Sequence, residues 1–400
     1  MMNIITETKK YNKIPPIVIF MLLFFYAIVD LQTSSVTGNI DANRSNVYLV
    51  LIAIIAFTSL YVIIISLFNK KIYLTEMTVA LGALTSWIIL IDIYQEVELW
   101  SMLVQLGLSV LWIFASSFFA LYMQRNPKGA SFIEKCICSM LILYAAATIY
   151  YFADLYYLRG QIPVMNLAYN VIVLIPWLCL LNNKKIEIMG YFITCIIVLI
   201  SMKRGALIVF PIMIFFNMFM KGIIEKRGGK YLLKLVAFLV FFCSALFVVD
   251  SISNGFISSR FSSEELASGS GRDWLYSTAI NSISNRGIID FILGFGSGSS
   301  VSYLGTGVHN EWLEFLFSFG LVGVFLYANL YGSIITRCIK IKRKAPMYLP
   351  ACTMMLTYML IVGLFGGIYF IHSTFYAFSF FGFVEGLANN KINQVAQTKG

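Results

Sequence analysis

The stretch GTGVHNEWLEFLFSFGLVGVFLY, residues 305–327, joins a polar segment to an apolar one. From Leu313 onward almost every residue is apolar, as in a helix that spans a membrane. Just before it stand His309, Asn310 and Glu311, and Glu314 follows one turn later. The chain has only two histidines, so a histidine beside carboxylates at the start of a predicted span is a candidate functional residue.

The composition extends this reading to the whole chain. Of 400 residues, 59% are hydrophobic and 12% are charged, and the mean hydropathy is +0.82. Soluble domains are nearer half apolar and a quarter charged, so the composition predicts an integral membrane protein. The net charge of +10 does not indicate a nucleic-acid partner, because Lys and Arg collect on the cytoplasmic loops of membrane proteins. The segment IPPIVIFMLLFFYAIVDLQ lacks a small-residue cleavage site and is expected to be the first span.

About 20 apolar residues in a helix cross the hydrocarbon layer. Twelve segments fit this rule: 15–31, 47–68, 77–93, 101–122, 136–152, 164–181, 186–202, 205–220, 231–250, 312–334, 347–369 and 373–388. The prediction is an all-α integral membrane protein of about 12 transmembrane helices. Helices 1–9 occupy 1–250, a large loop occupies 251–310, and helices 10–12 with a cytoplasmic tail occupy 311–400.

The connecting charges orient these spans. Basic residues are frequent in alternate gaps and at the termini, which by the positive-inside rule are cytoplasmic. The gaps predicted to be external contain few: Arg44, Arg159, Lys203, Arg204, Arg260, Arg272 and Arg286. We therefore expect both termini inside and the loop 251–310 outside.

The large external loop contains one helical pattern. Leu275, Ala279, Ile280 and Ile283 recur at helical spacing, which predicts a short amphipathic helix on the outer membrane face; the alternative is a disordered loop. The segment GFGSGSS, 294–300, lacks the spacing of a phosphate-binding loop and is interpreted as a flexible external loop.

Two positively charged positions are candidate anion sites. Lys203 and Arg204 fall between two apolar runs, where cations are costly unless they snorkel or meet an anion. Gly205 would let the backbone approach that anion. Arg272 lies in the first turn of the loop helix, where it and backbone N–H groups would share a phosphate. The alternative for Arg272 is a salt bridge to Asp273 or Glu265.

His309 is the candidate for proton transfer, because an imidazole beside a carboxylate suits that chemistry near neutral pH. It is expected to share a helix face with Leu313. The other histidine, His372, is interpreted as structural. The outer face has no His/Cys cluster and no Asp-x-Asp motif, so neither a metal site nor a cofactor is expected. The seven cysteines are expected to be small hydrophobic residues without disulfides.

In this order the motifs resemble the bacterial O-antigen polymerase/O-antigen ligase family, of the Wzy and WaaL type. The resemblance rests on SMKRGALI (201–208), GRDWLYSTAINSISNRGIIDFILGFGSG (271–298) and HNEWLEFLFSFGLVG (309–323). Outside roughly 200–325 only the architecture is similar. Some polymerases carry Arg-x10-Gly segments in two external loops, whereas here Arg260 to Gly271 has that spacing once. A relay between two loops is therefore not expected.

The resemblance implies a metal-independent, GT-C-like glycosyltransferase of the bacterial cytoplasmic (inner) membrane. Its donor would be a glycan on undecaprenyl pyrophosphate. Its other partners would be a glycan acceptor, membrane lipid, a chain-length regulator and a flippase. The expected function is polysaccharide polymerisation, of O-antigen or capsule type. The alternatives are an O-antigen ligase that transfers the glycan to another acceptor and a lipid-linked glycan flippase or transporter, which is not an enzyme.

The positions carried over from the family are Arg204, Arg272 and His309. Arg204 and Arg272, supported by Lys203, would bind the pyrophosphate. His309 would be the base or a phosphate ligand. Glu311 and Glu314 would orient it or serve as alternative bases.

Overall fold

A computed structural model describes residues 75–397 apart from 127–128, 161, 163, 181–182, 268–271 and 367–373, together with isolated residues between 23 and 64. The predicted spans 15–31 and 47–68 therefore lie almost wholly outside the described residues, and so does His372. Within the described part the chain is helical and forms no strand.

The long helices are α3 (Glu76–Tyr94), α4 (Leu99–Arg125), α5 (Ala130–Ala153, continued by a π-helical turn Asp154–Leu158), α8 (Lys184–Ile200), α9 (Arg204–Ile224), α10 (Gly228–Ile252), α16 (Glu311–Lys344), α17 (Leu349–Phe365) and α18 (Thr374–Gln397). Shorter helices are α6 (Leu167–Ile172), α7 (Ile175–Leu178), α11 (Phe256–Arg260), α12 (Ser263–Ala267), α13 (Arg272–Ser284), α14 (Ile288–Leu293) and α15 (Ser299–Leu304), and a 3-10 turn at Pro346–Tyr348 precedes α17.

Seven helices of the described part are long and apolar enough to cross a membrane, which supports a multi-pass, all-α membrane protein. They coincide with predicted spans 77–93, 101–122, 136–152, 205–220, 231–250, 312–334 and 347–369. The predicted span 164–181 corresponds to two short helices, α6 and α7, and 186–202 to the 17-residue α8. The total of twelve and the GT-C-like arrangement stay predictions.

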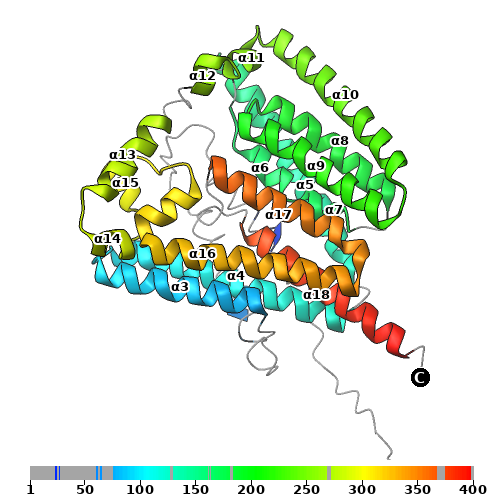
Figure 1. The fold of residues 1–400 in the computed structure, drawn as a ribbon. Helices are drawn as coiled ribbons and strands as arrows, with labels where there is room; N and C mark the ends of the chain where they lie inside the picture. The colour runs from blue at the N-terminus through cyan, green and yellow to red at the C-terminus, as the bar shows by residue number, and fades with distance from the viewer. Residues whose placement is uncertain are drawn as a thin grey trace, which may run out of the picture.

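The helices form two groups joined by α17 (Figure 1). α3, α4, α16 and α18 pack side by side, and α5 to α10 form the second group, with α17 against α9. Small residues bring α18 close to α4: a Cβ at Gly382 would lie 2.0 Å from the Ser116 carbonyl oxygen. Such close backbone approach is a usual way to pack membrane helices, because apolar side chains gain little by leaving lipid.

α16 is kinked at Gly320, whose φ of 65° and ψ of −169° only glycine adopts easily. A Cβ there would lie 2.2 Å from the Ile292 carbonyl oxygen. The kink turns carbonyl groups away from the helix ladder, and neighbouring segments satisfy them. Phe317 O accepts from Phe295 N at 3.1 Å, Ser318 O from Gly296 N at 2.8 Å, and Phe319 O from the indole Nε1 of Trp87 at 2.9 Å.

These bonds fix the segment 294–297 across the kink. Asp92 on α3 accepts from both the backbone N and the Oγ of Ser297, each at 2.8 Å. Gln95 Nε2 donates to Gly294 O at 2.6 Å. The prediction of a flexible loop at 294–300 was therefore wrong: this glycine-rich segment ties α3 to α16, and the backbone approach needs residues without a side chain.

The described residues of 253–310 form five short helices, α11 to α15, and α13 is the predicted helix. Leu275, Ala279 and Ile283 of α13 are buried against residues such as Val308 and Phe317. Ile280, the fourth residue of the predicted pattern, is 51% exposed. Protein therefore covers the apolar stripe that predicted a membrane-surface helix.

Candidate functional site

Four cations, Lys203, Arg204, Arg260 and Arg272, gather where the loop 251–310 meets the helical bundle. We call them the cationic cluster. α8 ends at Ile200 and α9 begins at Arg204, so Lys203 and Arg204 occupy the short turn between two apolar helices. The backbone N of Met165 donates to the Ser201 carbonyl at 3.0 Å and fixes this turn.

Arg204 fastens the loop to the bundle. Its Nη1 donates to the Arg260 carbonyl oxygen at 2.8 Å, and the same nitrogen lies 3.7 Å from Glu265 Oε2 on α12. Glu265 thus pairs with Arg204, and the described residues contain no salt bridge from Arg272 to Glu265 or Asp273. The salt-bridge alternative for Arg272 is not supported.

Arg260, at the end of α11, belongs to the cluster although the sequence did not identify it as a site residue. Its guanidinium lies 5.6 Å from the centre of the Phe256 ring. Burial and the neighbouring charges of Arg204 and Arg272 lower its pKa, while Glu265 raises it. The only sequence signal was a basic residue in a gap predicted to be poor in them.

The pKa of Lys203 reflects the repulsion among these positive charges. Burial, followed by repulsion from Arg272, Arg260 and Arg204, lowers its pKa from 10.5 to about 8. An anion among these groups would relieve that repulsion and raise the pKa of Lys203 again. The turn therefore concentrates positive charge, and the predicted role of Lys203 and Arg204 in binding an anion stays a prediction.

Gly205 has a role other than the predicted one. A Cβ at this position would lie 2.0 Å from the hydroxyl oxygen of Tyr169 on α6. The missing side chain makes room for Tyr169, so it does not leave the backbone open to an anion. Tyr169 also lies close enough to Arg272 for that cation to act on its hydroxyl electrostatically. This contact between distant segments places a phenol beside the cluster.

His309 lies in the same electrostatic neighbourhood. Partial desolvation, then the positive charges of Arg272 and Lys203, lower its pKa below 6.5, and Glu314 acts in the opposite direction. The imidazole is therefore mostly neutral at pH 7 and able to accept a proton. Its side chain is exposed, with Nε2 3.5 Å from Thr306 Oγ1.

The backbone at His309 differs from the prediction. Its φ is 58°, and Asn310 is the N-cap of α16, accepting from Leu313 N at 3.1 Å. His309 thus precedes the helix and cannot share a helical face with Leu313. The left-handed conformation is uncommon for a residue with a side chain, and it turns the chain immediately before the span.

Glu314 organises the loop around His309. Its carboxylate accepts from Ser300 Oγ at 2.6 Å, from Val308 N at 2.9 Å and from Ser318 Oγ at 3.2 Å. These bonds hold the segment 300–308, and with it His309, against the first turns of α16. The role of Glu314 in orienting His309, or as an alternative base, stays a prediction.

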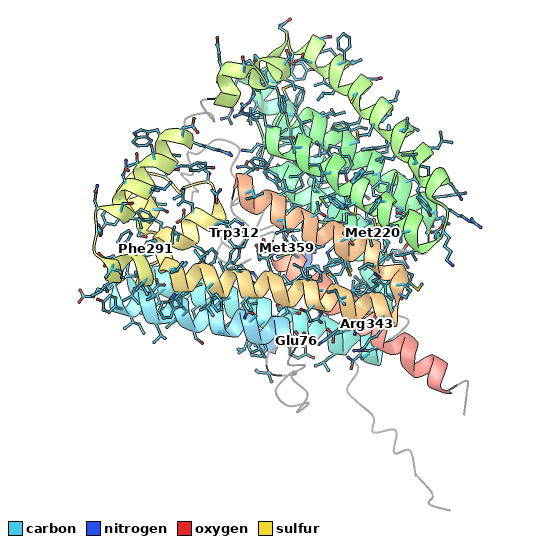
Figure 2. The ribbon with its side chains drawn as sticks, in the orientation of Figure 1. Glu76, Met220, Phe291, Trp312, Arg343 and Met359 are labelled. Carbon is cyan, nitrogen blue, oxygen red and sulfur yellow. The ribbon has the colours of Figure 1, made fainter. Side chains whose placement is uncertain are left out.

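Glu311 points elsewhere. It is 0% exposed and accepts a hydrogen bond from the Tyr327 hydroxyl, and a Cβ at Gly363 would lie 3.0 Å from its Oε2. Tyr331 donates to the Met359 carbonyl at 3.1 Å, which joins α16 to α17 beside it; Figure 2 labels Trp312 and Met359 in this region. Glu311 thus lies where α16 packs against α17, and its predicted role toward His309 stays a prediction.

Lys203, Arg204, Arg272, His309 and Glu314 are therefore brought together, and Arg260 and Tyr169 join them. The described residues contain no group of three or more His, Cys, Asp or Glu able to hold a metal ion. The arrangement suits binding of a phosphate-containing anion beside a neutral imidazole. Models of known protein families find no match in this chain, and a search of curated proteins finds no sequence that matches it.

Proposed function

We propose that the protein is a membrane glycosyltransferase that polymerises polysaccharide, of O-antigen or capsule type, from oligosaccharides carried on undecaprenyl pyrophosphate. The observation that carries the proposal is the cationic cluster beside His309 and Glu314, at one end of a bundle of apolar helices. The apolar helices suit a polyprenyl tail, and the cluster suits its pyrophosphate.

The proposed reaction needs two kinds of group. The bond between the donor sugar's anomeric carbon and the pyrophosphate oxygen breaks, and its electron pair leaves with the pyrophosphate. Fixed cations stabilise that growing negative charge. The acceptor hydroxyl forms the new bond to the anomeric carbon and gives its proton to His309. Glu314, which raises the pKa of His309, stabilises the imidazolium that results.

The transporter alternative is less well supported. A transporter that moves a charged substrate usually places its essential charges near the middle of the membrane. Here the cations lie at the turn before α9 and in the loop 251–310. A ligase would use the same groups, so the acceptor must decide between ligase and polymerase.

The proposal also places the cluster on the outer membrane face. The test is cysteine labelling in a cysteine-free variant, with Cys at Ser302, which is exposed on α15, and at Lys342, which is exposed near the end of α16. A membrane-impermeant maleimide added to intact cells should label the first and spare the second until the cells are opened. The reverse pattern would place the cluster on the cytoplasmic side and would contradict a polymerase that acts on the outer face.

The activity itself is tested with synthetic undecaprenyl-pyrophosphate oligosaccharide as sole donor and acceptor. The purified protein should produce a ladder of glycans whose lengths differ by one repeat unit, and it should release lipid pyrophosphate. Both should occur with EDTA present. His309→Asn should abolish the ladder without unfolding the protein, because asparagine tolerates the left-handed backbone that His309 adopts.

Other outcomes discriminate among the alternatives. A single transfer that occurs only after a different acceptor is added would indicate a ligase. No new glycosidic bond with any acceptor would exclude both enzymes and favour the transporter.

A further inference from the structure

A second group of charges lies at the opposite end of α16. A cavity of about 270 Å³ opens there between α3, α16 and α18. Its charged lining consists of Glu76, Arg337, Lys340, Lys344 and Glu385, and we call it the basic cavity. Figure 2 labels Glu76 and Arg343 at this end of the molecule and Phe291 at the other.

The sequence of α16 builds one wall of the cavity. Arg337, Lys340 and Lys344 are spaced three and four residues apart, so they project from one helix face. Lys342 and Arg343 are exposed on the same turns but do not line the cavity. The end of α16 therefore carries two pairs of cations with equal charge. Lys340 and Lys344 face the cavity, whereas Lys342 and Arg343 do not.

The contacts within the cavity leave it positively charged. Arg337 is 5% exposed and forms an ion pair with Glu385. Lys340 Nζ lies 2.6 Å from Glu76 Oε1, and Lys344 Nζ lies 3.5 Å from the neutral Asn389 Oδ1. Three cations thus face two carboxylates, and the lysines near the opening are exposed.

Apolar side chains continue from the cavity along the membrane-spanning part of the helices. On α3 the exposed side chains Val79, Ala83 and Leu90 follow the cavity residue Glu76 at helical spacing. Val79, one turn beyond Glu76 on α3, is 57% exposed. A positive cavity with an apolar track beside it matches a molecule with an anionic head and hydrocarbon chains.

We propose that the basic cavity binds the phosphate headgroup of an anionic phospholipid, whose acyl chains lie along Val79 and Leu90 of α3. Clustered Lys and Arg at the end of a span attract anionic headgroups. Lys344 donates to the phosphate, and Lys340 exchanges part of its contact with Glu76 for a second. The buried Arg337–Glu385 pair forms the base of the site. This proposal concerns a different site from the cationic cluster and does not depend on the proposed reaction.

The test is native mass spectrometry of the purified protein titrated with phosphatidylglycerol, phosphatidylcholine or inorganic phosphate. The Lys340→Gln/Lys344→Gln pair is compared with Lys342→Gln/Arg343→Gln, which removes the same charge from the same turns. Each basic residue near a headgroup contributes roughly fivefold in affinity. The cavity pair should therefore lose about thirtyfold for phosphatidylglycerol, whereas the control pair should change less than about threefold.

Three results would overturn the proposal: equal losses in the two pairs, equal affinity of the wild type for phosphatidylcholine, or displacement of phosphatidylglycerol by millimolar phosphate. The first would reduce the effect to general surface charge, the second would remove headgroup selectivity, and the third would make the site one for free phosphate. If the double variant unfolds, Lys344→Gln alone replaces it, because that lysine's contact is to a neutral amide.

Discussion

The crowding of positive charge around Lys203 predicts that this residue destabilises the protein while no anion is bound. Replacing it with methionine keeps a long side chain and removes the charge. Lys203 is the N-cap residue of α9, but its side chain makes no capping hydrogen bond, so the substitution removes no cap. Lys203→Met should therefore stabilise the ligand-free protein.

The magnitude follows from the lowered pKa. Each tenfold change in proton affinity corresponds to about 1.4 kcal/mol, so lowering the pKa of Lys203 from 10.5 to about 8 corresponds to roughly 3 kcal/mol. Solvent and counter-ions reduce that figure, which is an upper limit. In a protein of 400 residues the variant should melt up to about 4 °C higher than the wild type.

The pH dependence gives a sharper test. The pKa of Lys203 is lower in the folded than in the unfolded protein, so folding carries the full penalty below pH 8. As the pH rises from 8 to 10.5, the folded wild type releases this proton and the penalty disappears. The advantage of Lys203→Met should therefore be largest at pH 6–7 and should shrink at pH 9.5.

The assay is thermal unfolding in detergent at pH 6.5, 8 and 9.5, with and without a polyprenyl pyrophosphate. Lys185→Met, which removes a lysine exposed at the start of α8, is the matched control and should have little effect. With the ligand present the order should reverse, because the wild type gains an attraction that the variant lacks. A gain that is independent of pH, or equal in the control, would refute the electrostatic argument.

Two further predictions concern the arginine contacts and the kink. Arg204→Lys and Arg272→Lys should each lower polymerisation ten- to hundredfold, since lysine keeps the charge but loses bidentate phosphate contacts; Arg159→Lys, at an exposed surface pair with Asp154, should be mild. Gly320→Ala should lower the free energy of unfolding by at least about 1–3 kcal/mol, the cost of backbone strain alone, and the clash with the Ile292 carbonyl should add to it. An equilibrium unfolding assay should detect this loss. Gly332→Ala, which has open space around it, should leave stability unchanged or raise it.

The sequence was most informative where a single local rule decides the structure. Apolar length predicted seven of the described spans, because a membrane helix must satisfy its own backbone hydrogen bonds and bury apolar side chains over a fixed thickness. Helical spacing predicted α13. Lys203, Arg204 and Arg272 were identified because they stand in gaps with few basic residues. Unpaired cations are costly at such a membrane boundary.

What the sequence could not predict depends on contacts between distant segments. The kink at Gly320 is recognisable only when the segment 294–296 is seen donating to the carbonyl groups it exposes. The direction of Glu311 depends on where α16 begins, because a shift of one residue rotates a side chain by about 100° around the helix. Gly205 and Tyr169 meet through folding, and no local pattern links them.

Photo-crosslinking with a polyprenyl-pyrophosphate sugar that carries a diazirine beside the pyrophosphate tests the central claim most directly. After irradiation in membranes, peptide mass spectrometry should locate the adducts on segments around Tyr169, Lys203, Arg272 and His309, and excess unlabelled polyprenyl pyrophosphate should suppress them. The same pattern should weaken in Arg272→Lys. Adducts confined to the opposite end of α16, around Glu76 and Lys344, would contradict the account by placing the pyrophosphate far from the cationic cluster.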